Sequence, residues 1–324
     1  MAETEESLIT QIQKFAVNDG PGFRTNVFIK GCSLRCLWCH NPETQSFKRD
    51  LYWKSRLCVQ CGACFEACQR EAINAPIPPE VAQREGSAYH KIIRERCDNC
   101  LKCVDACAYG ALEIVGRPLS VDEIMDEVAQ DSIFYDNSGG GMTISGGEPM
   151  AQREFANELL IAAKNMGIHV CLDTSGFCRW EELEPMAKRS DIVLYDLKHL
   201  DTSKHKELTG VGNELILQNL RHLCENGVET WLRIVVIPGI SYSIDYHLEV
   251  ANFLKALPRP IDRIDLLPFH NWCQDKYRWL GRPWSMGADI EALDPSEVEP
   301  LQEPYEAVGF NVTVGGSGFE GNSE

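Results

Sequence analysis

The chain has 324 residues, 44% of them hydrophobic, so it can bury a substantial core, and wholesale disorder is excluded. Its formal net charge of −17 repels phosphate backbones and argues against a nucleic-acid partner. Residues 1–7 lack a secretory pattern and no apolar run reaches the length of a membrane span, so we expect a cytoplasmic enzyme that contacts no membrane.

Apolar, β-rich runs alternate with helical stretches over most of the chain. The predicted strands are 26–30, 142–145, 168–172, 192–197, 229–237 and 261–267. The predicted helices between them include 121–130, 154–165, 213–226 and 244–255. This alternation is typical of parallel βαβ units, so the predicted fold class is α/β, and six units suggest a partial (β/α)6 barrel of the TIM type. Active-site residues should then gather at the carboxyl ends of the strands.

Three cysteines follow the first predicted strand, with the spacing Cys32-x3-Cys36-x2-Cys39. Clustered thiols in a reducing compartment indicate metal binding rather than disulfides. Thiolates favour iron–sulfur clusters or zinc, and three of them leave one iron of a four-iron cluster without a protein ligand. We favour such an open cluster. The alternatives are a zinc site completed by His40 and three structural cysteines.

A second cysteine pattern occurs twice between the first two predicted strands. Both copies have the spacing C-x2-C-x2-C-x3-C that is found in bacterial two-cluster ferredoxins, although Gln69 and Ala108 replace the usual proline after each copy. In those ferredoxins the fourth cysteine of each motif ligates the other cluster. The spacing therefore predicts one cluster on Cys58, Cys61, Cys64 and Cys107, and another on Cys97, Cys100, Cys103 and Cys68.

This block is interpreted as an inserted ferredoxin-like domain. We place it at residues 53–114, so that it divides a barrel made of residues 1–52 and 115–324. Its simplest role is to relay electrons from a donor to the three-cysteine site. Two zinc sites are the alternative for its metals, and a structural or docking role is the alternative for its function.

Further motifs follow one another along nearly the whole chain. They are 19–24 (DGPGFR), 31–43 (GCSLRCLWCHNPE), 139–149 (GGGMTISGGEP), 173–176 (DTSG), 196–198 (DLK), 231–239 (WLRIVVIPG) and 266–270 (LLPFH). This ordered set resembles the radical S-adenosylmethionine (SAM) superfamily. Within that superfamily it is similar to the activating enzymes of glycyl radical enzymes, and the repeated cysteine motif matches a subgroup that carries two extra clusters.

The resemblance implies an activity and a set of site residues. A [4Fe–4S] cluster on Cys32, Cys36 and Cys39 would cleave SAM reductively, and the 5′-deoxyadenosyl radical would abstract hydrogen from a glycine of a partner enzyme. The implied SAM contacts are Gly146, Gly147, Glu148, Asp173, Lys198, Arg233 and His270. A monovalent cation, Na⁺ or K⁺, is implied at Asp173, Thr174 and Asp196, and helix capping is the alternative role of the two aspartates.

The implied partners are a glycyl radical enzyme and an electron donor such as a flavodoxin or a ferredoxin. Asp19 and Arg24 are implied contacts with the partner enzyme, and a polar turn is their alternative role. With the insert, the chain would carry three [4Fe–4S] clusters. Two other functions stay open at this point: a radical SAM enzyme that acts on a small molecule or a peptide, and an electron carrier that binds no SAM.

Overall fold

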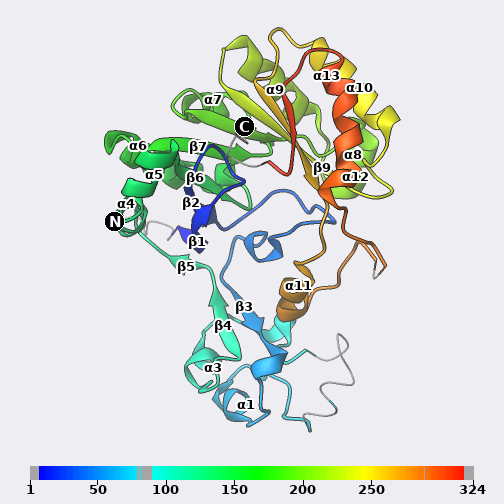
Figure 1. Cartoon of the computed structure of the whole chain (residues 1–324). Coiled ribbons are helices and arrows are strands. Elements are labelled where there is room, and N and C mark those ends of the chain that lie inside the picture. Colours follow the sequence, from blue (N-terminus) through cyan, green and yellow to red (C-terminus); the bar gives the residue numbers. More distant parts are fainter. Residues whose placement is uncertain (1–6, 79–80, 82–89, 288, 317–324) are drawn as a thin grey trace.

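The computed structural model describes residues 7–78, 81, 90–287 and 289–316 (Figure 1). Its main sheet has nine strands in the order β11-β10-β9-β8-β7-β6-β2-β1-β5. These strands are β1 (Leu8–Ala16), β2 (Arg24–Ile29), β5 (Arg117–Pro118), β6 (Gly141–Gly146), β7 (His169–Thr174), β8 (Ile192–Asp196), β9 (Thr230–Val236), β10 (Arg263–Pro268) and β11 (Val312–Val314). Strands β2 and β6 to β11 are parallel, whereas β1 is antiparallel to both of its neighbours, β2 and β5.

All six predicted strands are present as β2 and β6 to β10, side by side and parallel. The structure adds a seventh parallel strand, β11, and the antiparallel pair β1 and β5 at the other edge. Within the described residues the two edge strands do not pair with each other, so the sheet is open and no closed barrel forms. The α/β class is confirmed by this arrangement.

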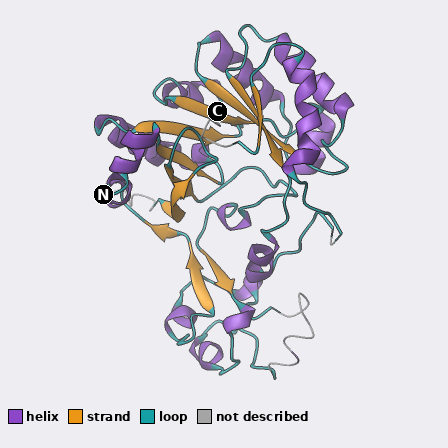
Figure 2. Cartoon of the chain, in the orientation of Figure 1, coloured by secondary structure: helices purple, strands orange, loops and turns teal. Residues whose placement is uncertain are grey.

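Helices pack on the outer side of the sheet (Figures 1 and 2). They are α4 (Val121–Ala129), α5 (Ser132–Ser138), α6 (Arg153–Asn165), α7 (Trp180–Ala187), α8 (Thr202–Thr209), α9 (Glu214–Glu225), α10 (Ile244–Lys255), α12 (Pro295–Val298) and α13 (Glu303–Glu306). Their apolar stripes share one core with the strands; Leu160, Leu220 and Leu254 are buried there with Ile144 and Leu232. Local sequence sets the helix starts, as in the capping box that Ser120 and Glu123 form at α4.

The two faces of the sheet have different chemistry because side chains alternate along a strand. On β9, Leu232 and Ile234 are buried in the apolar core beneath the helices, and Arg233 therefore points to the opposite face. Asp265 of the neighbouring β10 and Asp173 of β7, two strands away on the other side, contribute charge at or near the same inner face. The inner face is consequently where the chemistry of this fold lies.

A small lobe lies below the main sheet (Figure 1). It contains the antiparallel pair β3 (Asp50–Trp53) and β4 (Leu112–Val115), together with α1 (Ala63–Ala67) and α3 (Lys102–Asp105). Its own apolar cluster joins Leu51, Trp53 and Leu112 with the buried thiols of Cys64 and Cys103. A lobe of this size has a small core, and cysteines take up part of it.

Helix α11 (Gln274–Leu280) lies beside the small lobe, although it follows the last of the six predicted strands (Figure 1). Among the described residues no helix is long and apolar enough to cross a membrane.

Candidate active site

A cavity opens at the carboxyl ends of the parallel strands. Its volume is about 190 Å³. It brings together residues from six of the seven motifs, and Leu267 represents the 266–270 motif. Its lining includes Cys32, Cys36, Cys39, His40, Gly146, Gly147, Asp173, Thr174, Asp196, Lys198 and Arg233. Glu148, His270, Asp19 and Arg24, which the motifs also singled out, do not line it.

The three-cysteine loop follows β2 and is held against α8 by backbone hydrogen bonds and by apolar packing. The N–H groups of Arg35 and Leu37 donate to the carbonyls of Thr209 and Leu208 at the end of α8, over 2.7 and 3.0 Å. Trp38 is buried in an apolar cluster with Leu208 and neighbouring side chains. The loop is therefore fixed before any cofactor binds, with its three thiols facing the cavity.

The three thiols are in an environment that disfavours free thiolates. Burial raises the pKa of Cys32 and of Cys36 to about 12, and it raises the pKa of Cys39 as well. Metal ions bind thiolates, so ligation must supply the free energy of deprotonation. Three half-buried thiols that converge on one cavity fit an iron–sulfur cluster with an open iron better than three inert structural cysteines.

The glycines at the end of β6 are required by packing against the cysteine loop. Gly146 has φ +125°, and a Cβ on it would lie 2.2 Å from the carbonyl oxygen of Ile29. A Cβ on Gly147 would lie 2.3 Å from the carbonyl oxygen of Gly31. Their lack of side chains lets β6 and the loop come together, and both residues still line the cavity.

Asp173 and Arg233 face each other across the cavity wall. Nη1 of Arg233 lies 3.3 Å from Oδ1 of Asp173, and Nη2 lies 3.2 Å from Oδ1 of Asp19. Burial raises the pKa of Asp173 to about 7 although Arg233 opposes this shift, and Ser145 donates to its Oδ2 over 2.6 Å. Nε of Arg233 and Oδ1 of Asp173 are buried without a hydrogen-bond partner in the described structure. A polar ligand in the cavity would satisfy both atoms.

Asp196 and Lys198 form a second charged pair at the end of β8. Nζ of Lys198 donates to Oδ2 of Asp196 over 2.7 Å, and both side chains are mostly buried. Burial alone would lower the pKa of Lys198, but Asp196 and other nearby negative groups raise it overall. Lys198 is therefore a permanent cation in the cavity wall.

Glu148 does not line the cavity and binds Thr174, which does. The Glu148 carboxylate accepts hydrogen bonds from the Thr174 hydroxyl at 2.6 Å and from the Ser175 N–H and hydroxyl at 2.9 and 2.6 Å. Burial raises the pKa of Glu148, and these hydrogen bonds oppose the shift. Glu148 thus holds the ends of β6 and β7 together, a role that the sequence motif did not reveal.

His270 lies against His40 at the edge of the site. Their rings stack with centroids 4.0 Å apart, and Nε2 of His40 is 2.9 Å from the carbonyl oxygen of His270. Burial lowers the pKa of His40 to about 4 and also lowers that of His270, so both rings are neutral at pH 7.

Arg24 does not reach the surface. It is fully buried, and its guanidinium donates to the Thr143 hydroxyl over 2.6 Å and to the carbonyls of Met142 and Pro21. Asp19 accepts from Asn26 over 2.5 Å in addition to its pairing with Arg233. The expected contact of Arg24 with a partner protein is not available in this conformation. Both residues instead fix the 19–24 loop on the inner face of the sheet.

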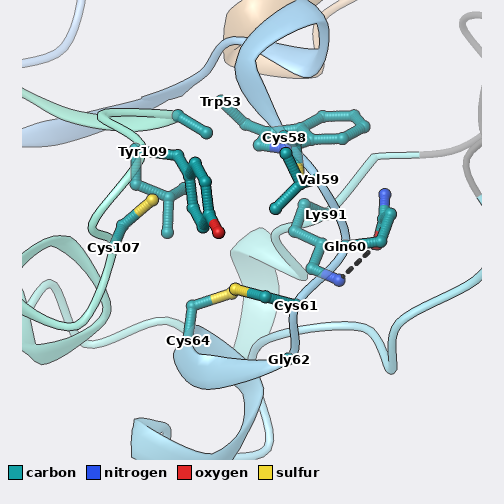
Figure 3. A pocket seen from close by; sticks show the side chains of 12 residues that line it. Trp53, Cys58, Val59, Gln60, Cys61, Gly62, Cys64, Lys91, Cys107 and Tyr109 are labelled. Atoms are coloured by element: carbon teal, nitrogen blue, oxygen red, sulfur yellow. Dashed lines mark hydrogen bonds between the residues drawn. The ribbon is translucent and has the colours of Figure 1, made fainter.

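The small lobe has a pocket of its own, with an empty volume of about 360 Å³ (Figure 3). Its lining contains four cysteines, Cys58, Cys61, Cys64 and Cys107. Three come from the first motif and the last from the end of the second. This is the crossed grouping that the ferredoxin spacing predicts. Cys103 lies close enough to Cys97 and Cys100, two other cysteines of its own motif, for both to raise its pKa.

Helix α11 connects the cysteine loop with the small lobe. The Tyr277 hydroxyl donates to the carbonyl of Cys39 over 3.0 Å, and Lys276 pairs with Glu43 at 2.6 Å. At the other end of the helix, Arg282 donates to the Pro42 carbonyl over 2.7 Å and pairs with Asp50 of β3 at 2.9 Å. The cysteine loop and the small lobe are thus held against one common support.

Within the described ranges, no three His, Cys, Asp or Glu side chains are grouped closely enough to hold a single metal ion. The carboxylates of Asp173 and Asp196 form ion pairs with Arg233 and Lys198, respectively.

We expect Asp196→Asn to weaken SAM binding about tenfold, because Lys198 would lose the anion that holds it in the cavity wall. Calorimetric titration of the anaerobic protein with SAM measures the effect. The matched control is Asp191→Asn, which breaks an Asp–Lys pair with Lys164 at 2.7 Å outside the cavity. Equal affinities in the two variants would contradict a role of Asp196 in the SAM site.

Comparisons with known proteins agree with this geometry. A model of the Radical SAM superfamily matches residues 101–254, and a 4Fe-4S dicluster domain model matches residues 57–111. The chain is 37% identical to the trans-4-hydroxy-L-proline dehydratase activating enzyme of Clostridioides difficile, over 95% of this chain and 99% of that protein. It is 40% identical to the benzylsuccinate synthase activating enzyme of Thauera aromatica, over 95% of this chain and 92% of that protein.

A third relative is the choline trimethylamine-lyase activating enzyme of Oleidesulfovibrio alaskensis, which is 37% identical over 95% of this chain and 98% of that protein. These relatives activate different enzymes, yet each matches nearly the whole chain, small lobe included. A pure electron carrier would not need the SAM-site half of the molecule. The chain therefore belongs to the activating enzymes of glycyl radical enzymes, within the radical SAM superfamily.

Proposed function

We propose that this protein installs a glycyl radical on a partner enzyme by means of a [4Fe–4S] cluster on Cys32, Cys36 and Cys39. These cysteines would hold the cluster, whose chemistry would be one-electron cleavage of the S–C5′ bond of SAM to methionine and a 5′-deoxyadenosyl radical, which would take hydrogen from the partner's glycine and leave as 5′-deoxyadenosine. The observation that carries this proposal is the convergence of these three thiols with Lys198 and Arg233 on one cavity.

The residues around the cavity suit a zwitterionic ligand such as the methionyl part of SAM. Lys198 and Arg233 offer positive charge for a carboxylate, and Nε of Arg233 has no hydrogen-bond partner of its own. Oδ1 of Asp173 accepts no hydrogen bond, although it lies 3.3 Å from Nη1 of Arg233, so it keeps acceptor capacity for the amino group or the sulfonium. Gly146 and Gly147 leave backbone accessible at the same edge. His270 would join them if its ring turned away from His40.

A monovalent cation, Na⁺ or K⁺, belongs to this proposal as a partner of the SAM carboxylate. Asp173 and Asp196 are at the ends of adjacent strands and provide the hard oxygen ligands that such ions prefer. The Thr174 hydroxyl already donates to Glu148, so Thr174 would contribute as an acceptor. Binding would require Asp196 to shift from Lys198.

We assign the two remaining clusters to an inserted domain at residues 53–114, between the 1–52 and 115–324 parts of a partial barrel. Support comes from the pocket shared by Cys58, Cys61, Cys64 and Cys107 and from the separate core of the small lobe. The second cluster would use Cys97, Cys100, Cys103 and Cys68. Three clusters in one chain allow electrons from a flavodoxin or a ferredoxin to reach the SAM site through the small lobe.

The activity is tested with the anaerobically reconstituted protein, SAM, a reductant and a candidate glycyl radical enzyme. A glycyl radical doublet in the electron paramagnetic resonance (EPR) spectrum of the partner supports the proposal. If SAM is cleaved to 5′-deoxyadenosine without a protein radical for any candidate partner, the substrate is a small molecule or a peptide instead. If SAM stays intact while the clusters are present, the radical SAM assignment fails.

We expect Cys61→Ala to lower the iron content of the small lobe while some SAM cleavage persists with dithionite, which can reduce the SAM-site cluster directly. The measurement is iron per chain together with 5′-deoxyadenosine formed. Cys224→Ala, which removes a buried thiol on α9, is the control and should keep both values. Complete loss of cleavage in Cys61→Ala alone would show that the small lobe is a structural support rather than a relay.

A further inference from the structure

Lys91 is a buried cation in the small lobe, and no carboxylate of the described residues pairs with it. Its side chain is 1% exposed, and its Nζ donates to Oε1 of Gln60 over 2.8 Å (Figure 3). Its backbone carbonyl accepts from the N–H of Asn74 at 2.9 Å, and the adjacent Ile92 pairs with Ile73, so its position is fixed. Among the described residues it forms no ion pair. A buried ammonium is costly without an anion, and one amide oxygen does not supply one.

The anion that suits Lys91 is an iron–sulfur cluster bound at the cysteine site beside this side chain. Lys91 lines the same pocket as Cys58, Cys61, Cys64 and Cys107 (Figure 3). Burial raises the pKa of the Cys64 thiol, and Lys91 is the strongest influence in the opposite direction. A cluster held by four thiolates is negatively charged overall, so its presence would give the buried ammonium its counter-ion.

The internal repeat shows that this charge is specific to one cluster. Lys91 precedes Cys97 by six residues, and the residue that precedes Cys58 by six is the uncharged Tyr52. The cation near Cys97 is Arg94, and Asp50 compensates it through an ion pair of 2.5 Å. The two cluster sites therefore differ in the charge around them although their cysteine spacing is the same.

We propose that Lys91 tunes the reduction potential of the cluster on Cys58, Cys61, Cys64 and Cys107. This inference rests on the proposed two-cluster assignment of the small lobe. Reduction adds one electron from the donor protein, and hence one negative charge, to a group that is already an anion. In a buried site the ammonium of Lys91 stabilises the reduced form more than the oxidised form, which raises the potential and makes this cluster a better electron acceptor.

The test is a potentiometric titration followed by EPR, on full-length protein that carries Cys36→Ala to remove the SAM-site signal. In this background Lys91→Met should shift one of the two midpoint potentials to a more negative value and leave the other in place. Lys91→Arg keeps the charge and should keep the potential. The matched control is Lys102→Met, which removes an exposed lysine bonded to Gln69 at 3.0 Å in the second motif.

Gln60→Glu provides an independent variant, because a carboxylate beside Lys91 would neutralise its charge without emptying its site. It should lower the same potential, whereas Gln69→Glu beside Lys102 should not. Iron content is measured for every variant, so a lobe that holds no clusters at all would be recognised separately as failure of the cluster assignment. Iron-loaded Lys91→Met or Gln60→Glu with both potentials within the range of the controls would overturn the proposal.

Discussion

Cys36→Ala is expected to abolish SAM cleavage completely, with no 5′-deoxyadenosine above the reagent blank. Cys36 is half-buried at the cavity, and the loop that carries it is anchored to the end of α8 on either side of the thiol. With two protein ligands left, the site cannot hold a four-iron cluster with one open iron. Cys32→Ala and Cys39→Ala should give the same result. The measurement is chromatography of the nucleoside products under dithionite.

Two comparisons make this expectation specific. Cys224→Ala removes a buried thiol of α9 on the helical side of the sheet and should keep full cleavage. Iron per chain in Cys36→Ala should fall only by the share of one cluster, since the small lobe has a separate set of cysteines. Retained turnover in any of the three cysteine variants would refute the assignment of this loop as the SAM site.

The sequence predicted the parallel core of the fold well because those strands are short, β-rich segments with several apolar residues, separated by helical stretches. The strand predicted at 142–145 is β6 (Gly141–Gly146), and the helix predicted at 244–255 is α10 (Ile244–Lys255). Strand β1 was not predicted, since its segment LITQIQKFA mixes polar and apolar residues, as suits a strand that is mostly half-exposed. Three-residue β11 is too short for any periodicity, and only pairing with β10 makes it a strand.

The site was predicted as a set of strand ends, and most of that set does line one cavity. Which of these side chains contact one another could not be predicted. Asp19 and Arg233 are more than two hundred residues apart in sequence, and their contact depends on how the 19–24 loop crosses the inner face. The same holds for Glu148, which the motif suggested as a SAM ligand and which binds Thr174 and Ser175 instead. Local patterns give residue chemistry, whereas nonlocal hydrogen bonds decide which atoms remain free for a ligand.

Helix α11 illustrates the same limit for the small lobe. Its seven residues, QDKYRWL, have little apolar periodicity, and nothing in them indicates the cysteine loop as a target. The contacts of Lys276, Tyr277 and Arg282 with residues 39–50 link parts of the chain that are far apart in sequence. Sequence reasoning therefore found the cysteines but missed the element that supports their loop.

Arg233→Met is expected to weaken SAM binding about ten- to a hundredfold and to destabilise the fold by about 3–5 kcal/mol. The first effect follows from the loss of the guanidinium whose Nε is unpartnered at the cavity. The second follows because Asp173 and Asp19 would be left without their cation. Calorimetric titration with SAM gives the affinity, and urea unfolding of the anaerobic protein gives the stability.

The two effects can be separated with variants that change one and not the other. Arg263→Met breaks a buried pair with Asp265, at 2.6 Å on the neighbouring strand, and should cost stability while SAM affinity is kept, because neither residue lines the cavity. Arg233→Met combined with Asp173→Asn should recover part of the stability, since removal of both charges leaves less charge uncompensated. The combined variant should not recover SAM affinity. If it did, Arg233 would serve only to neutralise Asp173, and the SAM carboxylate would have to be held by Lys198 alone.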